Sequence, residues 1–353
     1  MALASNQQWI ITAVGNEVNF WDFEHGKQFS KDKAHKPKDF SGQNLACPNS
    51  KFFVSWNSVQ QTLKVCDIES GQVFDLSGKV PFEYNSDFLV SPNGEFIVSY
   101  YCNQETDVIV YYHQQDKTIK IHVEDDIYSL AISPDSQSLI YATFDCVKFI
   151  DISTQTESRT IEKISEYQLE NIRISPNGEY LILCSTDRSI MHLDLNSEEV
   201  FRFKGVTVRI IWCCCWSNSF LDKISQIAIS FDSKFFVSAS QDHTIKVFDV
   251  QSKQLIHKFV DPDDCAVHAV CVSPDNRYIV TGHLDVKCYD LETKSHVHTI
   301  ENSLKKNGYT IIDIAISPNG KALFTSPSKS WTGFSQIYRL DAKPQNMDPS
   351  IFC

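Results

Sequence analysis

The side chains that could perform chemistry in this sequence are cysteine thiols and histidine imidazoles that stand close together along the chain. Cys213, Cys214 and Cys215 are adjacent, and one residue separates His296 from His298. Thiolates and imidazoles are the usual ligands of zinc, so each group could hold a metal ion. Adjacent strand residues point to alternating faces, however, and no CxxC spacing occurs in the chain. We therefore expect the two histidines to lie on a solvated outer strand.

The three cysteines belong to a segment, at about 204–220, that interrupts an otherwise regular pattern. Its apolar run, Ile210–Trp216, is the longest in the chain, at seven residues. We interpret the segment as an inserted, partly buried hairpin. Two alternatives remain open, namely an apolar patch that binds a partner and cysteine chemistry at Cys213–Cys215.

Two acidic segments have the composition of a calcium site. Asp261-Pro262-Asp263-Asp264 lacks the glycine and the distant glutamate of a calcium loop, and Glu124-Asp125-Asp126 stands at an equivalent place. We expect both to be acidic connecting turns. Common nucleotide-binding, zinc-protease and serine-hydrolase motifs are also missing from the sequence. The sequence therefore predicts no catalytic centre, no bound metal or cofactor and no small-molecule substrate.

Composition restricts the class of protein further. The chain has 353 residues, of which 42% are hydrophobic and 12% aromatic, so it can bury a large core. Its formal net charge of −12 argues against a surface for nucleic acid or anionic membranes. Apolar runs are too short to span a membrane, and residues 1–8 do not resemble a secretory signal. Cysteines inside apolar runs favour a reducing compartment. We expect an intracellular protein, in the cytoplasm or in a nuclear or cytoskeletal assembly.

A repeated phrase organises the whole chain. An apolar run leads into a turn such as Ser-Pro-Asn-Gly or Ser-Pro-Asp, and a second apolar run follows. Successive copies are 42 to 44 residues apart, except for one interval of 55 that contains the cysteine segment. The turn position falls at Ser5, Pro48, Pro92, Pro134, Pro176, Phe231, Pro274 and Pro318. Eight copies at this spacing indicate a repeat architecture.

Each copy predicts four short antiparallel strands. The second run is followed by a polar turn, then by a third run that ends in an aromatic or aliphatic residue plus aspartate, then by a more polar fourth run. One small sheet cannot bury both faces alone, so neighbours must stack around an axis as a β-propeller. The aspartates in the polar turns recur from copy to copy, which indicates turn chemistry rather than one active site; they are Asp145, Asp187, Asp242 and Asp285.

The repeats resemble the WD40 family over essentially the whole sequence. The best copy is residues 227–260, but Trp21-Asp22 is the only literal Trp-Asp pair, and the family's Gly-His dipeptide is absent. The resemblance implies one all-β domain over residues 1–353, a single β-propeller of four-stranded antiparallel blades. Eight repeats can be counted, and seven blades, the commoner number in the family, is the alternative.

The resemblance implies a non-enzymatic scaffold or adaptor that binds other proteins in a multi-subunit intracellular assembly. Lactonase-like propellers have similar turns, so the alternative is a hydrolytic propeller enzyme with a metal in the central channel. Such a site needs polar groups on the innermost strands. We expect those strands to be apolar, with Arg173 as the only charged interruption, and therefore we expect no enzyme.

Turns between second and third strands gather on one face of a propeller. In this sequence they vary in length while the strands do not, which suits a face that recognises a partner on a fixed scaffold. The turn at residues 328–335 contains Trp331 and Phe334, with Lys329 beside them. Exposed aromatic residues in loops often anchor protein interfaces. We therefore expect Trp331, Phe334 and Lys329 to contact a partner. The alternative is that either ring packs under the adjacent blade.

Overall fold

The structure, a computed structural model, describes residues 86–101, 106–203 and 224–300 without interruption. Elsewhere it describes short strands between residues 2 and 75, Leu76, and residues 310–316, 322–327 and 336–339. Strands and turns make up these residues, and no helix occurs among them. The chain divides into two compact units, residues 1–169 with 329–335 and residues 170–328 with 336–353.

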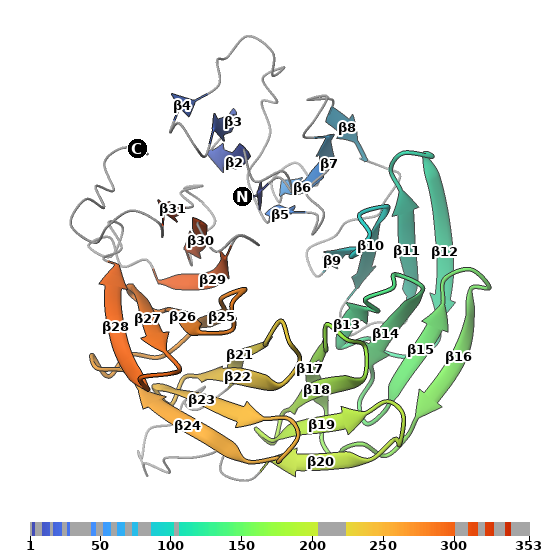
Figure 1. The fold of residues 1–353 in the computed structure, drawn as a ribbon. Helices are drawn as coiled ribbons and strands as arrows, with labels where there is room; N and C mark the ends of the chain where they lie inside the picture. The colour runs from blue at the N-terminus through green and yellow to red at the C-terminus, as the bar shows by residue number, and fades with distance from the viewer. Residues whose placement is uncertain are drawn as a thin grey trace, which may run out of the picture. The chain divides into compact units, whose positions relative to one another are not determined.

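The first unit contains four sheets (Figure 1). Their strands are β1 (Ala2–Leu3), β2 (Trp9–Val14), β3 (Glu17–Asp22) and β4 (Lys27–Gln28); β5 (Asn44–Ala46), β6 (Phe52–Asn57), β7 (Thr62–Asp67) and β8 (Val73–Asp75); β9 (Ser86–Val90), β10 (Phe96–Tyr101), β11 (Thr106–Tyr112) and β12 (Lys117–Val123); and β13 (Ser129–Ile132), β14 (Ser138–Ala142), β15 (Val147–Asp151) and β16 (Thr156–Ile161).

The second unit contains the remaining sheets. Their strands are β17 (Leu169–Ile174), β18 (Tyr180–Ser185), β19 (Ile190–Asp194) and β20 (Val200–Phe203); β21 (Ile224–Ile229), β22 (Phe235–Ser240), β23 (Thr244–Asp249) and β24 (Leu255–Val260); β25 (Ala269–Val272), β26 (Tyr278–Gly282), β27 (Val286–Asp290) and β28 (Ser295–Ile300); and β29 (Ile311–Ile316), β30 (Ala322–Pro327) and β31 (Gln336–Arg339). Strand β17 begins at the last residue of the first unit.

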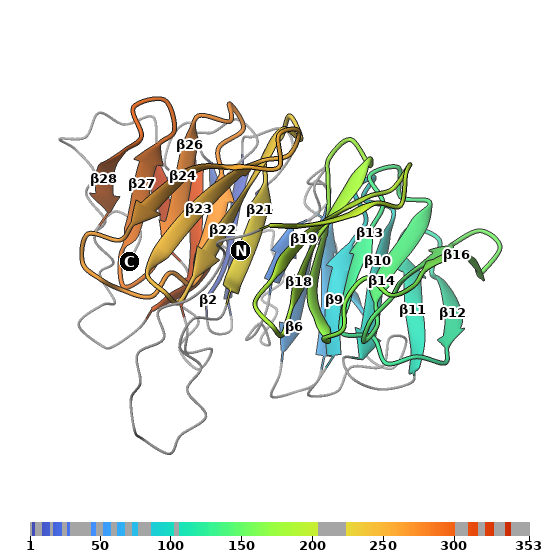
Figure 2. The same ribbon diagram turned by 90° about the horizontal axis from the view of Figure 1, so that it is seen from below.

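Every sheet is an antiparallel meander in which strands that are consecutive along the chain lie side by side, as β21 to β24 do in Figure 2. These sheets are the blades of a β-propeller, as the repeats predict. Within the described residues, seven sheets have four strands and β29–β31 has three. We call the four strands of a blade a, b, c and d in chain order. The a–b and c–d turns lie at one end of a blade, and the b–c turn and the d–a connection lie at the other.

The serine of the repeated phrase closes the a–b turn. In the turn after β17, the Oγ atom of Ser175 accepts hydrogen bonds from the backbone N–H groups of Glu179 and Tyr180, both at 3.1 Å. Asn177 accepts a second bond from Glu179, and Gly178 has a φ of 74°. Glycine adopts this left-handed conformation without steric cost. The same hydroxyl position is occupied in other turns by Ser91, Ser133, Ser230 and Ser273.

In some a–b turns the residue with a positive φ has a polar side chain. That side chain accepts a hydrogen bond from the backbone of the preceding blade. The Oγ atom of Ser233 accepts a hydrogen bond from the backbone of Asn177 at 3.2 Å. Asn276 accepts one in the same way from Phe231, whose turn position carries proline in most other copies. The a–b turns therefore join neighbouring blades as well as neighbouring strands.

The aspartate at the end of the third run closes the c–d turn. The carboxylate of Asp194 accepts bonds from the backbone N–H groups of Asn196 and Ser197, at 2.9 and 2.8 Å. Glu198 completes the turn with a φ of 60°. The carboxylates of Asp151, Asp249 and Asp290 accept turn N–H groups in the same way. The recurring aspartate is thus explained by local hydrogen bonding.

The core lies between successive blades. Phe203 of β20 packs edge-on against Phe236 and Phe248 of the next blade, with ring centroids 4.9 and 5.1 Å apart. Another cluster joins β9–β12 to β13–β16, and another joins β21–β24 to β25–β28. Because both faces of a blade are apolar, each blade needs its neighbours for stability.

Candidate functional site

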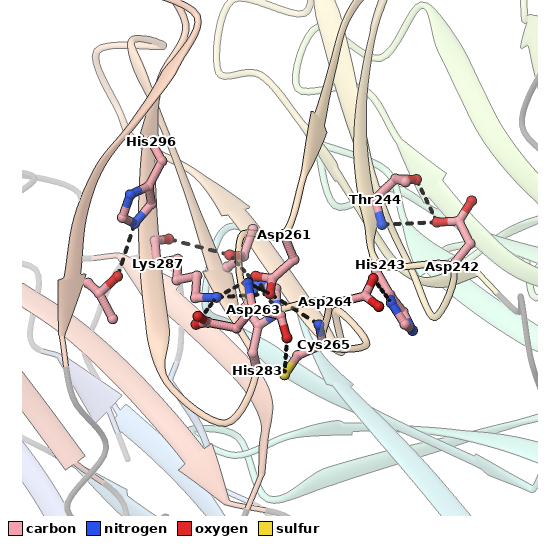
Figure 3. A network of polar contacts seen from close by, with 12 residues as sticks. Asp242, His243, Thr244, Asp261, Asp263, Asp264, Cys265, His283, Lys287 and His296 are labelled. Carbon is pink, nitrogen blue, oxygen red and sulfur yellow. Dashed lines mark hydrogen bonds and ion pairs between the residues drawn. The ribbon is translucent and has the colours of Figure 1, made fainter.

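A cluster of charged groups lies at the b–c end of the blade β25–β28 (Figure 3). Lys287, on β27, is buried, and its Nζ atom lies 2.9 and 2.7 Å from the two carboxylate oxygens of Asp261. The same Nζ atom lies 2.6 Å from Asp263, whose side chain is largely exposed. Burial alone would lower the pKa of Lys287, but the two carboxylates outweigh it and raise that pKa. The ammonium group therefore stays charged inside the fold.

A histidine completes this cluster. The Nδ1 atom of His283 lies 3.3 Å from the Asp261 carboxylate, and its Nε2 atom is 2.7 Å from the hydroxyl of Thr281. Burial lowers the pKa of His283 to about 4; Asp261 opposes this effect and Lys287 adds to it. The imidazole is therefore neutral at pH 7.

The cluster fastens a chain segment between two blades. The backbone N–H of Asp261 bonds the carbonyl of His243, in the b–c turn before it. The N–H of His268 bonds the carbonyl of Gly282, at the b–c turn after it. Asp261 also accepts the N–H groups of Asp263 and Cys265. The sequence predicts an acidic connecting turn here, but its pattern does not show that Asp261 is buried. Since the Asp261 carboxylate accepts bonds from Lys287 and from the turn N–H groups, this arrangement stabilises the connection.

A smaller version of the same arrangement occurs in the first unit. Lys148, on β15, donates to Asp125 at 2.7 Å and lies 3.3 Å from Glu157. Asp125 belongs to the other acidic segment, Glu124-Asp125-Asp126. Burial opposes the charged form of Lys148, but the carboxylates raise its pKa. Within the described residues, no group of three or more His, Cys, Asp or Glu could hold a metal ion.

The turn aspartates occupy b–c turns and have different contacts. The carboxylate of Asp187 accepts the N–H and the hydroxyl of Ser189, and that of Asp242 does the same for Thr244. Asp145 accepts the N–H of Ile164 through its backbone carbonyl, at 2.9 Å. Asp285 is buried, and its carbonyl accepts the N–H of His283.

Two large aromatic side chains are exposed at the b–c end of the blade β13–β16. Phe144 stands in the b–c turn and is 52% exposed, and Tyr167 stands in the following d–a connection and is 50% exposed. The carbonyl of Phe144 accepts the N–H of Leu169 at 3.1 Å, and that of Asp145 accepts Ile164. The segment that carries Tyr167 is therefore fastened at both ends to the turn that carries Phe144. The pair is not among the residues predicted from the sequence, although an aromatic residue in a short polar turn, as at Phe144, is a signal for such a site.

Other exposed apolar side chains lie mainly on d strands of the second unit. They are Val200 and Phe201 of β20, Leu255, Ile256 and Val260 of β24, and Val297 of β28. The c–d pairing shifts register in β23–β24 and in β27–β28. Such bulges twist an edge strand away from pairing with another chain. This rim is therefore less suited to strand addition than a flat edge.

The remaining sequence predictions have mixed outcomes. Trp331, Phe334, Lys329 and the segment 204–220 with its three cysteines lie outside the described residues. His296 is exposed on β28 and bonds Thr299 at 3.0 Å, which is the expected outer-strand position. The prediction of a single charged residue on the a strands was wrong. These strands begin earlier than expected, so Asp87, Glu170 and Asp313 lie on them as well as Arg173.

No stretch within the described part of the chain is a helix of the length and apolarity that a membrane span requires. Five cysteines in that part are free thiols: Cys146, Cys184, Cys265, Cys271 and Cys288.

Comparisons with known proteins identify the repeat. The family model described as "WD domain, G-beta repeat" matches residues 197–249 and 253–288, which confirms the resemblance shown by the sequence. Cleavage stimulation factor subunit 50 of Arabidopsis thaliana is 26% identical over 175 residues, covering 47% of this chain and 37% of that protein. The LST8 homolog of Drosophila melanogaster is 23% identical over 219 residues, covering 60% and 64%.

A third relative, the WD repeat-containing protein 26 homolog of Arabidopsis thaliana, is 28% identical over 119 residues, covering 33% of this chain and 18% of that protein. In each of these three comparisons, the match spans less than two thirds of the relative's own length.

Proposed function

We propose that this chain of WD40 repeats is a non-enzymatic scaffold that holds other proteins within a multi-subunit assembly. The proposal rests on one observation, the exposed pair Phe144 and Tyr167 on two segments that are hydrogen-bonded to each other. One of the relatives supports it, because its printed name, cleavage stimulation factor subunit 50, describes a subunit of a larger factor. Free thiols favour an intracellular location, and we propose the cytoplasm.

The backbone segments that carry these two rings are fixed by hydrogen bonds within the blade. The backbone on either side of Tyr167 is bonded to the b–c turn, and strands β14 and β15 pair over five residues beneath it. A partner therefore meets segments that are already ordered, which lowers the entropy cost of binding. Aromatic rings on such supports often supply most of the energy of an interface. We propose the same anchoring role for Trp331 and Phe334, with Lys329, in the last b–c turn.

The test compares removal of the two rings at Phe144 and Tyr167 with removal of an exposed ring elsewhere. Phe144→Ser with Tyr167→Ser removes the proposed anchor, and Phe231→Ser removes a ring that is 53% exposed in an a–b turn, at the other end of its own blade. Losing an anchor costs about 2 kcal/mol or more, roughly a 30-fold loss of affinity. We expect the double variant to lose its partners in quantitative affinity purification, and Phe231→Ser to keep them.

Thermal unfolding provides the control, because exposed side chains change stability by only about 0.5 kcal/mol. If both variants keep every partner at normal stability, the anchor is not at Phe144 and Tyr167.

The alternative is a hydrolytic propeller enzyme with a metal in the central channel. One observation favours it, namely that Asp313 lies on β29, an a strand, and such a metal site draws its ligands from a strands. Metal analysis of the purified protein separates the two functions. Stoichiometric metal that is lost on changing Asp313 to Asn would support the enzyme.

A further inference from the structure

The charges around Phe144 and Tyr167 have mostly one sign. The segments 124–126, 143–148 and 162–168, which lie with the pair at the b–c end of the blade, contain six carboxylates and two lysines. The carboxylates are Glu124, Asp125, Asp126, Asp145, Glu162 and Glu166. One lysine, Lys148, is already paired with Asp125 and Glu157. Lys163 is the other, so the exposed rings stand in a surface with excess negative charge.

From this we infer that the segment which packs on Phe144 and Tyr167 is a basic stretch of a partner protein, rich in lysine or arginine. The inference rests on the proposed function and names the chemistry of its partner. A cation is attracted both to the faces of aromatic rings and to the carboxylates beside them. An acidic segment at the same place would bring like charges together, which costs affinity.

Phe231, an exposed phenylalanine in an a–b turn, shows the contrast. Phe231 is as exposed as Phe144, but its turn carries both signs, with Lys234 3.6 Å from Asp232. Arg277 lies on the neighbouring a–b turn, whose Asn276 bonds the backbone of Phe231. A basic segment would gain no comparable attraction there. The combination of exposed rings and excess negative charge therefore selects the surface at Phe144 and Tyr167.

A display experiment tests the inference with the full chain. A library of random 12-residue peptides is selected on the immobilised protein, and the recovered peptides are synthesised with a fluorescent label for anisotropy measurements. We expect recovered peptides to carry net positive charge. We also expect their binding to be lost in Phe144→Ser with Tyr167→Ser, and to weaken as salt concentration rises.

Charge reversal supplies the matched control. Glu162→Lys with Glu166→Lys changes two exposed acids beside Tyr167, and we expect affinity for the basic peptides to fall about tenfold or more. Glu198→Lys with Glu199→Lys makes the same change in net charge at a c–d turn. Lysine is tolerated at position 198, because Lys253 and Lys294 occupy the same left-handed place in other blades. This control is expected to bind normally.

The outcomes separate the two proposals. Neutral or acidic peptides that depend on Phe144 and Tyr167 would overturn the basic partner and leave the scaffold proposal standing. Basic peptides that bind equally well without the two rings, or that respond equally to both charge reversals, would overturn this surface as their site. Recovery of no peptide at all would also overturn the inference.

Discussion

Lys287 keeps a positive charge inside the fold because Asp261 and Asp263 both lie within 2.9 Å of its Nζ atom. The two aspartates differ in exposure to solvent. Asp261 is fully enclosed, whereas the Asp263 side chain is largely exposed, so only Asp261 would be left as a buried charge if the lysine were removed. At this scale, stability depends on keeping both members of one pair.

Replacing one member of the pair is therefore expected to cost more than replacing both. Lys287→Met leaves the Asp261 carboxylate buried without its main counter-charge, and we expect the free energy of unfolding to fall by about 3 kcal/mol or more. The double variant with Asp261→Asn should recover part of that loss, because asparagine can still accept the turn N–H groups. Urea denaturation of the four proteins measures the coupling. Strictly additive losses would show that the pair does not act as a unit.

At the scale of the element, the a–b turn determines where each blade reverses direction. Its serine hydroxyl accepts two backbone N–H groups, and in the blade β17–β20 the serine itself is fully buried. The left-handed residue that follows is glycine, serine or asparagine, residues that suit a tight turn. The five blades from β9 to β28, whose a–b turns the structure describes, therefore form their first hairpins from contacts within six residues.

Ser175→Ala tests this role. The N–H of Tyr180 loses its hydroxyl partner in a buried place, and we expect a loss of about 1–3 kcal/mol in the free energy of unfolding. Gln251→Ala, at an exposed turn position, is the control and should change stability by less than about 0.5 kcal/mol. Chemical denaturation measures both. An equal, small effect of the two changes would mean that water replaces the hydroxyl.

At the scale of the whole molecule, we propose that residues 1–353 form one domain. Core clusters inside each unit are shared between successive blades, so a blade cannot lose its packing alone. Unfolding curves followed by circular dichroism and by tryptophan fluorescence should therefore coincide. Two separate transitions would contradict the proposal.

The pH dependence of that unfolding follows from two buried histidines. Burial, with Lys253 adding to it, lowers the pKa of His192 to about 4, and the pKa of His283 is also about 4. An unfolded histidine titrates near 6.5, so below that pH the unfolded chain binds more protons than the folded one. Stability should fall as pH drops from about 6.5 to 4, by up to about 1.4 kcal/mol per pH unit for each histidine.

His192→Phe is the variant for this prediction, because a phenyl ring can keep the stacking on Tyr180, whose ring centroid is 4.8 Å from that of His192. Urea denaturation at several pH values should give a shallower acid slope for the variant than for the native protein. An unchanged slope would show that other groups cause the acid sensitivity.

The repeat, the four-stranded antiparallel blade and the turns can be predicted from the order of residues alone. These features depend on contacts within a few residues, such as Ser175 with Tyr180 and Asp194 with Ser197. Alternating apolar runs then indicate which faces must be covered. Local hydrogen bonds and alternation can be recognised in the order of residues, because the interacting groups are neighbours along the chain.

Which polar groups are enclosed, and which aromatic rings are left uncovered, depends on how the chain packs in three dimensions. Asp261 and Lys287 are 26 residues apart, and the aspartate is buried because segments from two blades cover it. Phe144 resembles the phenylalanines of the core in type, but no described segment covers half of its ring. Burial depends on what the rest of the chain places beside a residue, and spacing along the sequence does not contain that information.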